Sequence, residues 1–213
     1  MLQSLNIISG IVVAEPNLFF HIKHISYLSI RIDGHKQSLE SLGQELLDLK
    51  TFTLFNSNVG NINISTFDNF PSGLTQLIFS KSQSFAGLNN LENLKIMYEK
   101  ITDIDSDTFR NLKSLKNLTL SHNKIYDIYD KAFHGLNLQL LDLKYNKLTA
   151  IKKEMFSGLK CKVLDLSMNE ISLIESNSFK NMICQLIFVT SLNIQGGDKN
   201  YWGLSNATEI IKL

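Results

Sequence analysis

Apolar residues return along the chain at places that repeat every 23 residues. Three consecutive segments, 115–136, 138–159 and 161–182, align without a gap. Each carries apolar residues at its first, fourth, sixth and eleventh places, Asn at the ninth, Ile at the fourteenth, Phe at the nineteenth and Leu or Met at the twenty-second. Such self-similarity at a fixed period indicates a repeat protein, in which each unit buries its apolar side against its neighbours.

This register extends outward to cover the chain in about nine units. Their first places are Leu2, Ile25, Leu49, Leu74, Leu91, Leu115, Leu138, Cys161 and Cys184. The units within 91–182 keep the pattern closely, whereas those within 2–90 are degenerate. We therefore predict a single repeat domain over 1–213. Its last part, 184–213, holds a final repeat and a possible C-terminal lid, with Ile210, Ile211 and Leu213 as the apolar side.

The first half of each unit has the pattern of a short strand. Leu118 and Leu120 alternate with Thr119 and Ser121, and this period of two is typical of a strand with one buried face. Strands of this length are not stable alone, so stacked units are expected to pair them into a parallel sheet. The third, fifth, seventh and eighth places of each unit are then expected to be freely variable positions on the open face of that sheet.

Asn and Phe recur at two further places that a stack of such units has to fill. Where the chain turns away from each strand, a primary amide supplies both donor and acceptor to buried backbone groups. We predict this role for Asn123, Asn146 and Asn169. Rings farther along the units are predicted to stack as a spine: Phe67, Phe109, Phe133, Phe156 and Phe179. Trp202 falls at the spine place of the last unit.

The pattern LxxLxLxxNxLxxIxxxxFxxL carried by these segments resembles the leucine-rich repeat of the typical class. That class dominates extracellular animal proteins such as Toll-like receptor ectodomains, Slit-like proteins and secreted invertebrate repeat proteins. The resemblance implies an α/β solenoid, a leucine-rich repeat horseshoe with a parallel concave sheet and a convex side that carries the Phe spine. It also implies a non-enzymatic module that recognises a protein partner through the concave face, either as an extracellular protein or as a fragment of a receptor ectodomain. An intracellular scaffold and a non-catalytic subunit of a secreted enzyme complex remain alternatives.

The cysteines depart from that family. Extracellular members usually close both ends with cysteine-rich caps, whereas this chain has two cysteines, Cys161 and Cys184, at the first places of consecutive units. We interpret them as core thiols that replace Leu. A disulfide between them is also geometrically possible, because adjacent strands bring their Cα atoms about 5 Å apart. Without caps, either the chain is a fragment or its ends are covered by other means.

Indications of where the protein resides are mixed. Asn63, Asn117 and Asn206 each begin an N-glycosylation sequon, which a secreted protein would use. The apolar start of the chain has no preceding basic residue and fits a repeat, so we predict no signal peptide there. No apolar stretch has the length of a transmembrane helix. The extracellular or cell-surface prediction rests on the family resemblance, and a cytoplasmic location is the alternative.

Charge and motifs argue against several other functions. Lys and Arg number 21 and Asp and Glu 20, and a formal net charge of +1 provides no field that gathers phosphate backbones, so we predict no nucleic-acid partner. The chain has no phosphate loop of the GxxxxGK type. His21 and His24 have no further ligands at metal-binding spacing. We therefore predict no metal and no cofactor.

The candidate binding residues occupy the open face of the predicted sheet. The eighth places form a column of large side chains: Tyr98, His122, Tyr145 and Met168. Around them we place Met97, Asp142, Lys144 and Asp165. Large amphipathic side chains on a rigid sheet give a protein partner much contact area at little cost in entropy. An enzyme that uses Asp142 and Asp165 as paired carboxylates is disfavoured, because an open face does not exclude water.

Overall fold

The chain forms two compact units of stacked parallel strands. The computed structural model describes residues 4–11, 24–32, 46–54, 71, 74–78, 88, 90–97, 101–190 and 198–213. One unit comprises Met1–Ile96 with Asn111–Ser114, and the other comprises Met97–Arg110 with Leu115–Leu213. Five residues singled out above lie outside the described residues: Leu2, His21, Asn63, Phe67 and Tyr98.

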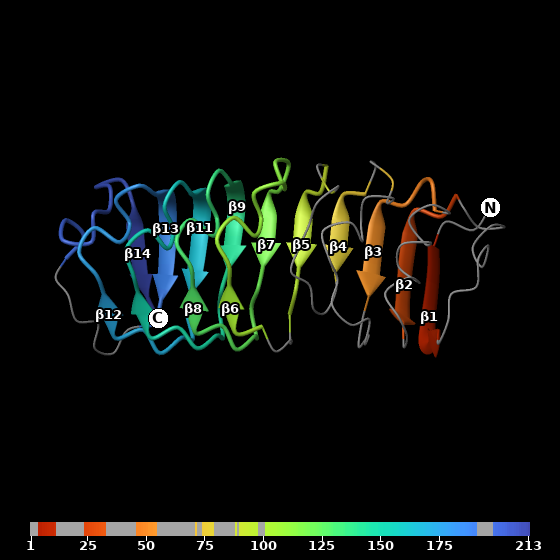
Figure 1. The fold of residues 1–213 in the computed structure, drawn as a ribbon, viewed down its shortest axis with the longest axis horizontal. Coiled ribbons are helices and arrows are strands. Elements are labelled where there is room, and N and C mark those ends of the chain that lie inside the picture. The colour runs from red at the N-terminus through yellow and green to blue at the C-terminus, as the bar shows by residue number, and fades with distance from the viewer. Residues whose placement is uncertain are drawn as a thin grey trace. The chain divides into compact units, whose positions relative to one another are not determined.

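The first unit is a parallel sheet (Figure 1). Its strands, in both chain and sheet order, are β1 (Ser4–Ile11), β2 (Tyr27–Ile32), β3 (Thr51–Leu54), β4 (Gln76–Ile78) and β5 (Asn93–Lys95). Leu28 pairs in register with Phe52, and both side chains are fully buried. One apolar residue from each strand thus stacks on the next, as the repeat register requires.

The second unit repeats this arrangement with five further strands. They are β7 (Asn117–Thr119), β9 (Asn137–Asp142), β11 (Lys160–Leu166), β13 (Ile183–Val189) and β14 (Glu209–Lys212). All four neighbouring pairs are parallel. The fourth-place residues Leu118, Leu141, Leu164 and Ile187 lie in register and are buried. The predicted stack of parallel strands is therefore confirmed.

The C-terminal tail contains a strand where the sequence suggested a lid. β14 pairs in parallel with β13, and Ile210 lies in register with Ile187. Ile211 and Leu213 are exposed. The tail thus continues the sheet by one more strand, with Ile210 half-buried beside the buried Ile187.

Each of four repeats also has a second, two-residue strand that the sequence analysis did not predict. These strands are β6 (Asp103–Ile104), β8 (Asp127–Ile128), β10 (Ala150–Ile151) and β12 (Leu173–Ile174). They pair in parallel, β6 with β8 and β10 with β12. Each ends in the Ile of the fourteenth place, which is buried. The inward Ile was visible in the sequence, but two residues are too few to show a strand period.

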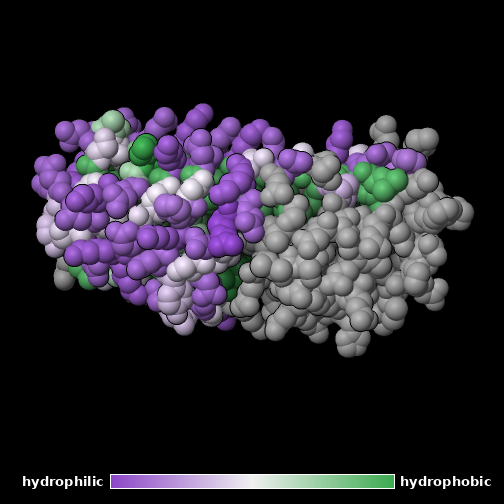
Figure 2. Space-filling model, turned by 45° about the horizontal axis from the view of Figure 1, so that its top comes forward, coloured by the Kyte–Doolittle hydropathy of each residue, from purple (hydrophilic) through white to green (hydrophobic). Residues whose placement is uncertain are grey.

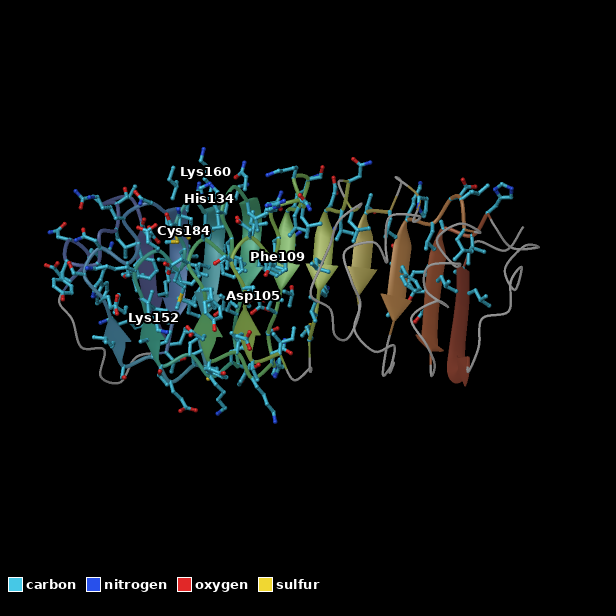
Figure 3. All side chains as sticks on the ribbon, viewed as in Figure 1. Asp105, Phe109, His134, Lys152, Lys160 and Cys184 are labelled. Atoms are coloured by element: carbon cyan, nitrogen blue, oxygen red, sulfur yellow. The ribbon has the colours of Figure 1, made fainter. Side chains whose placement is uncertain are left out.

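The Phe residues at the nineteenth places of consecutive repeats stack on one another. Neighbouring ring centroids from Phe109 to Phe179 are 5.7, 5.8 and 5.9 Å apart, with interplanar angles of 4°, 11° and 15°. Figure 3 labels Phe109, where this stack begins among the described residues. Trp202 is buried, and its carbonyl oxygen accepts the backbone N–H of Phe179 at 3.0 Å.

The Asn side chains lie at the turn that follows each strand and link neighbouring repeats. The Nδ2 group of Asn146 donates to the carbonyls of Leu143 in its own repeat (2.9 Å) and Leu120 in the preceding one (3.0 Å). Its Oδ1 atom accepts the N–H of Ile125 at 3.1 Å. Asn169 bonds its own and the preceding repeat in the same way. A single amide therefore satisfies backbone groups of two turns.

Candidate binding face

The eighth-place column lies on a left-handed turn directly after each strand. His122, Tyr145 and Met168 have φ values of 58°, 54° and 55°. The N–H groups of His122 and Tyr145 donate to the carbonyls of Lys144 and Ser167 in the next repeat. Because this turn recurs once per repeat, its backbone strain belongs to the architecture and is not a mark of a reactive site.

Two rings of this column stack on each other. The His122 and Tyr145 centroids are 4.4 Å apart at an interplanar angle of 19°. Lys144 places its Nζ atom 5.2 Å from the Tyr145 centroid, within cation–π range. Tyr145 and Met168 are each 43% exposed. The side chains are therefore held in place while one face of the column remains open to solvent.

The two aspartates of the predicted site are engaged in their own turns. Asp142 and Asp165 lie in register on β9 and β11. Asp142 Oδ1 accepts the Lys144 N–H at 3.0 Å, and Asp165 Oδ1 accepts the N–H and hydroxyl of Ser167 at 2.9 and 2.5 Å. Both carboxylates are half-buried, and each accepts a backbone N–H two residues later, at the end of its strand. This local bonding gives Asp a structural role at this place.

The expectation of a freely variable, open face is wrong at four described positions. Ser29, Thr119, Ser121 and Ser167 are buried, although they occupy fifth and seventh places. The Ser167 hydroxyl is consumed by the Asp165 carboxylate. Because these small side chains are buried, only part of the predicted face is available to a partner.

An apolar row on the same face was missed by the sequence analysis. Leu140, Val163 and Leu186 occupy the third places of their repeats. They lie in register on β9, β11 and β13. All three are half-buried. On the same face of β13, Phe188 follows Leu186 by two residues and pairs in register with the exposed Ile211 of β14. The signal was an apolar residue at the third place of three successive repeats, where the first aligned unit has Asn117.

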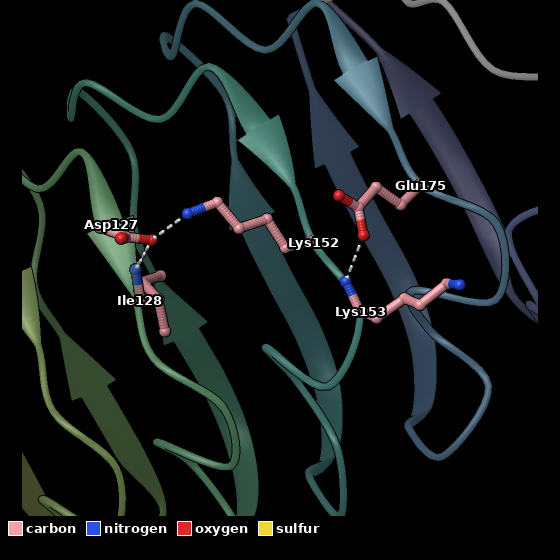
Figure 4. A network of polar contacts seen from close by, with 5 residues as sticks. All are labelled: Asp127, Ile128, Lys152, Lys153 and Glu175. Carbon is pink, nitrogen blue, oxygen red and sulfur yellow. Dashed lines mark hydrogen bonds and ion pairs between the residues drawn. The ribbon is translucent and has the colours of Figure 1, made fainter.

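The opposite side of these repeats carries charged side chains that pair between repeats. Lys152 contacts Asp127 at 2.8 Å, and Lys147 contacts Glu170 at 2.8 Å. Glu175 accepts the backbone N–H of Lys153 at 2.9 Å (Figure 4). The hydrogen bond to Asp127 raises the pKa of Lys152 above its ordinary value. These pairs link neighbouring turns of the solenoid.

Most described side chains on the face drawn in Figure 2 are hydrophilic, and apolar ones form small separate patches. Within the described ranges, no group of three or more His, Cys, Asp and Glu side chains is arranged to hold a metal ion. His24 instead pairs with Asp48, with Nδ1 and Oδ2 2.8 Å apart. The same part of the chain has no helix with the length and apolar character needed to span a membrane.

Comparisons with known proteins identify the family. A model of the leucine rich repeat matches residues 75–125, 89–148, 114–161 and 137–184, so the chain belongs to the leucine-rich repeat family. Among solved structures it is similar to the crystal structure of the TLR13–ssRNA13 complex, with 26% identity and a TM-score of 0.53. The match covers 85% of this chain and 24% of that chain, so this chain spans about a quarter of its neighbour. No curated protein matches. The predicted resemblance to Toll-like receptor ectodomains is thereby confirmed.

Proposed function

We propose that this chain is a non-enzymatic recognition module that binds a protein ligand through the sheet face of its second unit. The observation that carries the proposal is the apolar row Leu140, Val163 and Leu186, which lies in register on the same face as the stacked rings of His122 and Tyr145. Half-buried aliphatic side chains flanked by an ordered Tyr supply apolar anchors with a polar border. That composition is typical of protein–protein contact surfaces.

The choice of protein over RNA rests on charge and apolar character. The TLR13 neighbour is a complex with ssRNA13, so it does not support the exclusion of nucleic acid that the charge balance suggested. On this chain, however, Asp142 and Asp165 lie beside the apolar row. The nearby cation, Lys144, lies over the Tyr145 ring. Phosphate backbones are bound by clustered Lys and Arg side chains. An acidic and apolar face favours a protein ligand.

We assign the module to an extracellular or cell-surface receptor-like protein, in line with its resemblance to Toll-like receptor ectodomains. The intracellular scaffold and the non-catalytic subunit of a secreted complex are the competing assignments. Asn206 supports the secreted location, because its side chain is exposed in the turn before β14. Asn117, by contrast, is half-buried and in register with Leu140 on the proposed binding face.

Expression in animal cells, followed by glycopeptide mapping, tests this location. We expect a glycan on Asn206 that disappears in Asn206→Gln, and lower occupancy at Asn117, where a glycan would cover the sheet face. Asn117→Gln is the matched control and is expected to leave secretion unchanged. A chain that stays in the cytosol without any glycan would favour the scaffold assignment.

Binding is tested by screening the purified chain against two panels, one of secreted and cell-surface protein ectodomains and one of single-stranded RNA oligonucleotides. For a protein hit we expect Tyr145→Ala and Val163→Lys each to weaken affinity by about tenfold or more. Lys153→Ala, on the opposite side of the repeats, is the control that retains affinity. Melting curves show whether each variant is folded.

Two outcomes contradict the proposed binding face. Equal loss of affinity in Lys153→Ala would place the contact elsewhere. Binding to RNA alone, with an affinity that falls steeply as salt increases, would replace the protein ligand by a phosphate backbone.

A further inference from the structure

The two cysteines lie side by side inside the second unit. Cys161 on β11 and Cys184 on β13 are register partners in the parallel sheet. Their side chains are 6% and 5% exposed, and both are free thiols. The Sγ atoms are 3.0 Å apart, with the Cys161 thiol directed at the Cys184 sulfur. Figure 3 labels Cys184 within the stack of strands.

We propose that Cys161 and Cys184 form a thiol–disulfide site, which closes into a disulfide between adjacent repeats when the folding chain meets a small-molecule disulfide such as oxidised glutathione. Register partners on neighbouring strands are about 4.8 Å apart, within the Cα separation of about 4.4–6.8 Å that a disulfide spans. Both side chains already point to the same side of the sheet. Closure therefore requires side-chain rotation and no change in strand pairing.

The reaction proceeds by two thiol–disulfide exchanges. The Cys184 thiolate attacks one sulfur of the oxidant, forms a mixed disulfide and releases one small thiolate. The Cys161 thiolate then attacks the Cys184 sulfur, forms the Sγ–Sγ bond and releases the second small thiol. Overall the two protein thiols lose two protons and two electrons, and the oxidant is reduced from a disulfide to two thiols.

The environment of the pair distinguishes the roles of the two sulfurs. The hydrogen bond from Cys161 lowers the pKa of Cys184, against the opposing effect of burial. The same hydrogen bond, together with burial, raises the pKa of Cys161. The sulfur of Cys184 is thus the one that ionises first and begins the exchange, because the thiolate is the nucleophile.

Two observations direct the product to an intramolecular bond. The sequence contains two cysteines, so one pairing is available within the chain. Both sulfurs are buried, which keeps a second protein chain away from them in the folded state. The same burial slows attack on the finished fold, so the bond is expected to form mainly late in folding, after β11 and β13 have paired and before the rest of the last repeat closes over the sulfurs.

The test refolds the full chain from denaturant in a mixture of oxidised and reduced glutathione, with a reductant-only sample as reference. Samples are alkylated under denaturing conditions and analysed by intact mass and by non-reducing peptide mapping. We expect no alkylated cysteine, a mass lower by two hydrogen atoms and a peptide pair that joins Cys161 to Cys184 in the monomer. The melting temperature of the oxidised protein is expected to rise and to fall back when reductant is added.

Cys184→Ala is the matched variant, and its melting temperature is expected to be insensitive to the oxidant. Two alkylated thiols in the refolded wild type would overturn the proposal, as would glutathione adducts or disulfide-linked dimers as the main product. These readouts use the wild-type chain, so they decide the question even where a cysteine variant fails to fold.

Discussion

The central repeats, 115–182, and the terminal repeat, 184–213, fill the same places with different side chains. In the centre, Phe156 is sandwiched between two parallel rings, and Asn146 bonds the turns of two repeats. In the terminal repeat, Trp202 occupies the spine place. Two hydroxyls also bond backbone groups there: Thr190 accepts the Met168 N–H at 2.6 Å, and Thr208 donates to the Cys184 carbonyl at 2.7 Å.

The backbone contacts between repeats do not follow this change in side chains. The N–H of Lys131 donates to the Glu154 carbonyl at 2.9 Å in the centre, and the N–H of Phe179 donates to the Trp202 carbonyl at 3.0 Å toward the terminal repeat; both bonds join residues one repeat length apart. The register of the main chain thus continues into the terminal repeat while the interior chemistry varies. We conclude that side-chain identity tunes the stability of each repeat within a frame that the backbone maintains.

The largest expected effect comes from breaking the ring stack in the centre. Phe156→Ala opens a cavity between two rings in a fully buried layer and is expected to lower the free energy of unfolding by about 3–5 kcal/mol. Trp202→Phe restores in the terminal repeat the residue that the centre uses, and we expect it to cost less than about 1.5 kcal/mol. Denaturant unfolding of both variants measures the difference.

Similar losses in Phe156→Ala and Trp202→Phe would contradict this expectation, because Trp202→Phe removes much less side chain, and they would show that the terminal spine residue is the more tightly packed of the two. Lys153→Ala serves as the reference for this comparison, because its exposed side chain lies outside the stack.

An intermediate effect is expected from the amide that joins two turns. Asn146→Asp keeps the size and the acceptor for the Ile125 N–H but removes the donor to Leu120 and Leu143, and sets a buried charge beside their carbonyls. We expect it to lower the free energy of unfolding by about 2–3 kcal/mol at neutral pH. Thr190→Val, which removes one half-buried acceptor in the terminal repeat, is expected to cost about 1 kcal/mol.

The ranking of these two variants by thermal melting is the decisive readout. A Thr190→Val variant that melts below Asn146→Asp would mean that the terminal hydroxyl is more important to stability than the central amide. The distinction between the two regions would then have to be reversed.

Much of the frame was predictable because it depends on residues that recur at a fixed spacing. Leu118, Leu141 and Leu164 each stand at the fourth place, and a buried strand face follows from their alternation with polar neighbours. The Asn and Phe places were recognisable for the same reason. The second set of short strands was not, because two residues such as Asp127 and Ile128 carry no measurable period.

The binding face was predictable only in part, since it depends on how side chains turn between neighbours. Sequence places Ser167 and Lys144 at equivalent positions, yet Ser167 is buried against Asp165 while Lys144 extends to the Tyr145 ring. The apolar row of Leu140, Val163 and Leu186 was concealed because the third place of the preceding repeat holds the polar Asn117. Paired charges such as Lys147 and Glu170, at the same place of successive repeats, were a usable signal.

The smallest expected effect concerns polar links between repeats. The ion pair of Lys152 with Asp127 is exposed on its lysine side, where solvent screens it, so we expect Lys152→Ala to cost only a few tenths of a kcal/mol. Because the pKa of Lys152 is raised in the folded state, its contribution is fully present below the ordinary lysine value of 10.5 and is lost as the pH rises through the raised pKa. The effect should therefore not change between pH 6 and 9, roughly the range well below lysine titration.

The terminal repeat provides the contrast to this exposed pair. The Nζ group of Lys199 donates a part-buried hydrogen bond to the carbonyl of Thr208. We expect Lys199→Ala to cost about 1 kcal/mol, which is more than Lys152→Ala. Unfolding curves at low and high salt separate the two, because salt weakens an exposed ion pair more than a part-buried hydrogen bond. If both variants lose the same stability and respond equally to salt, the polar contacts at the surface of the two regions do not differ in strength. The contrast between the regions is then confined to their interiors.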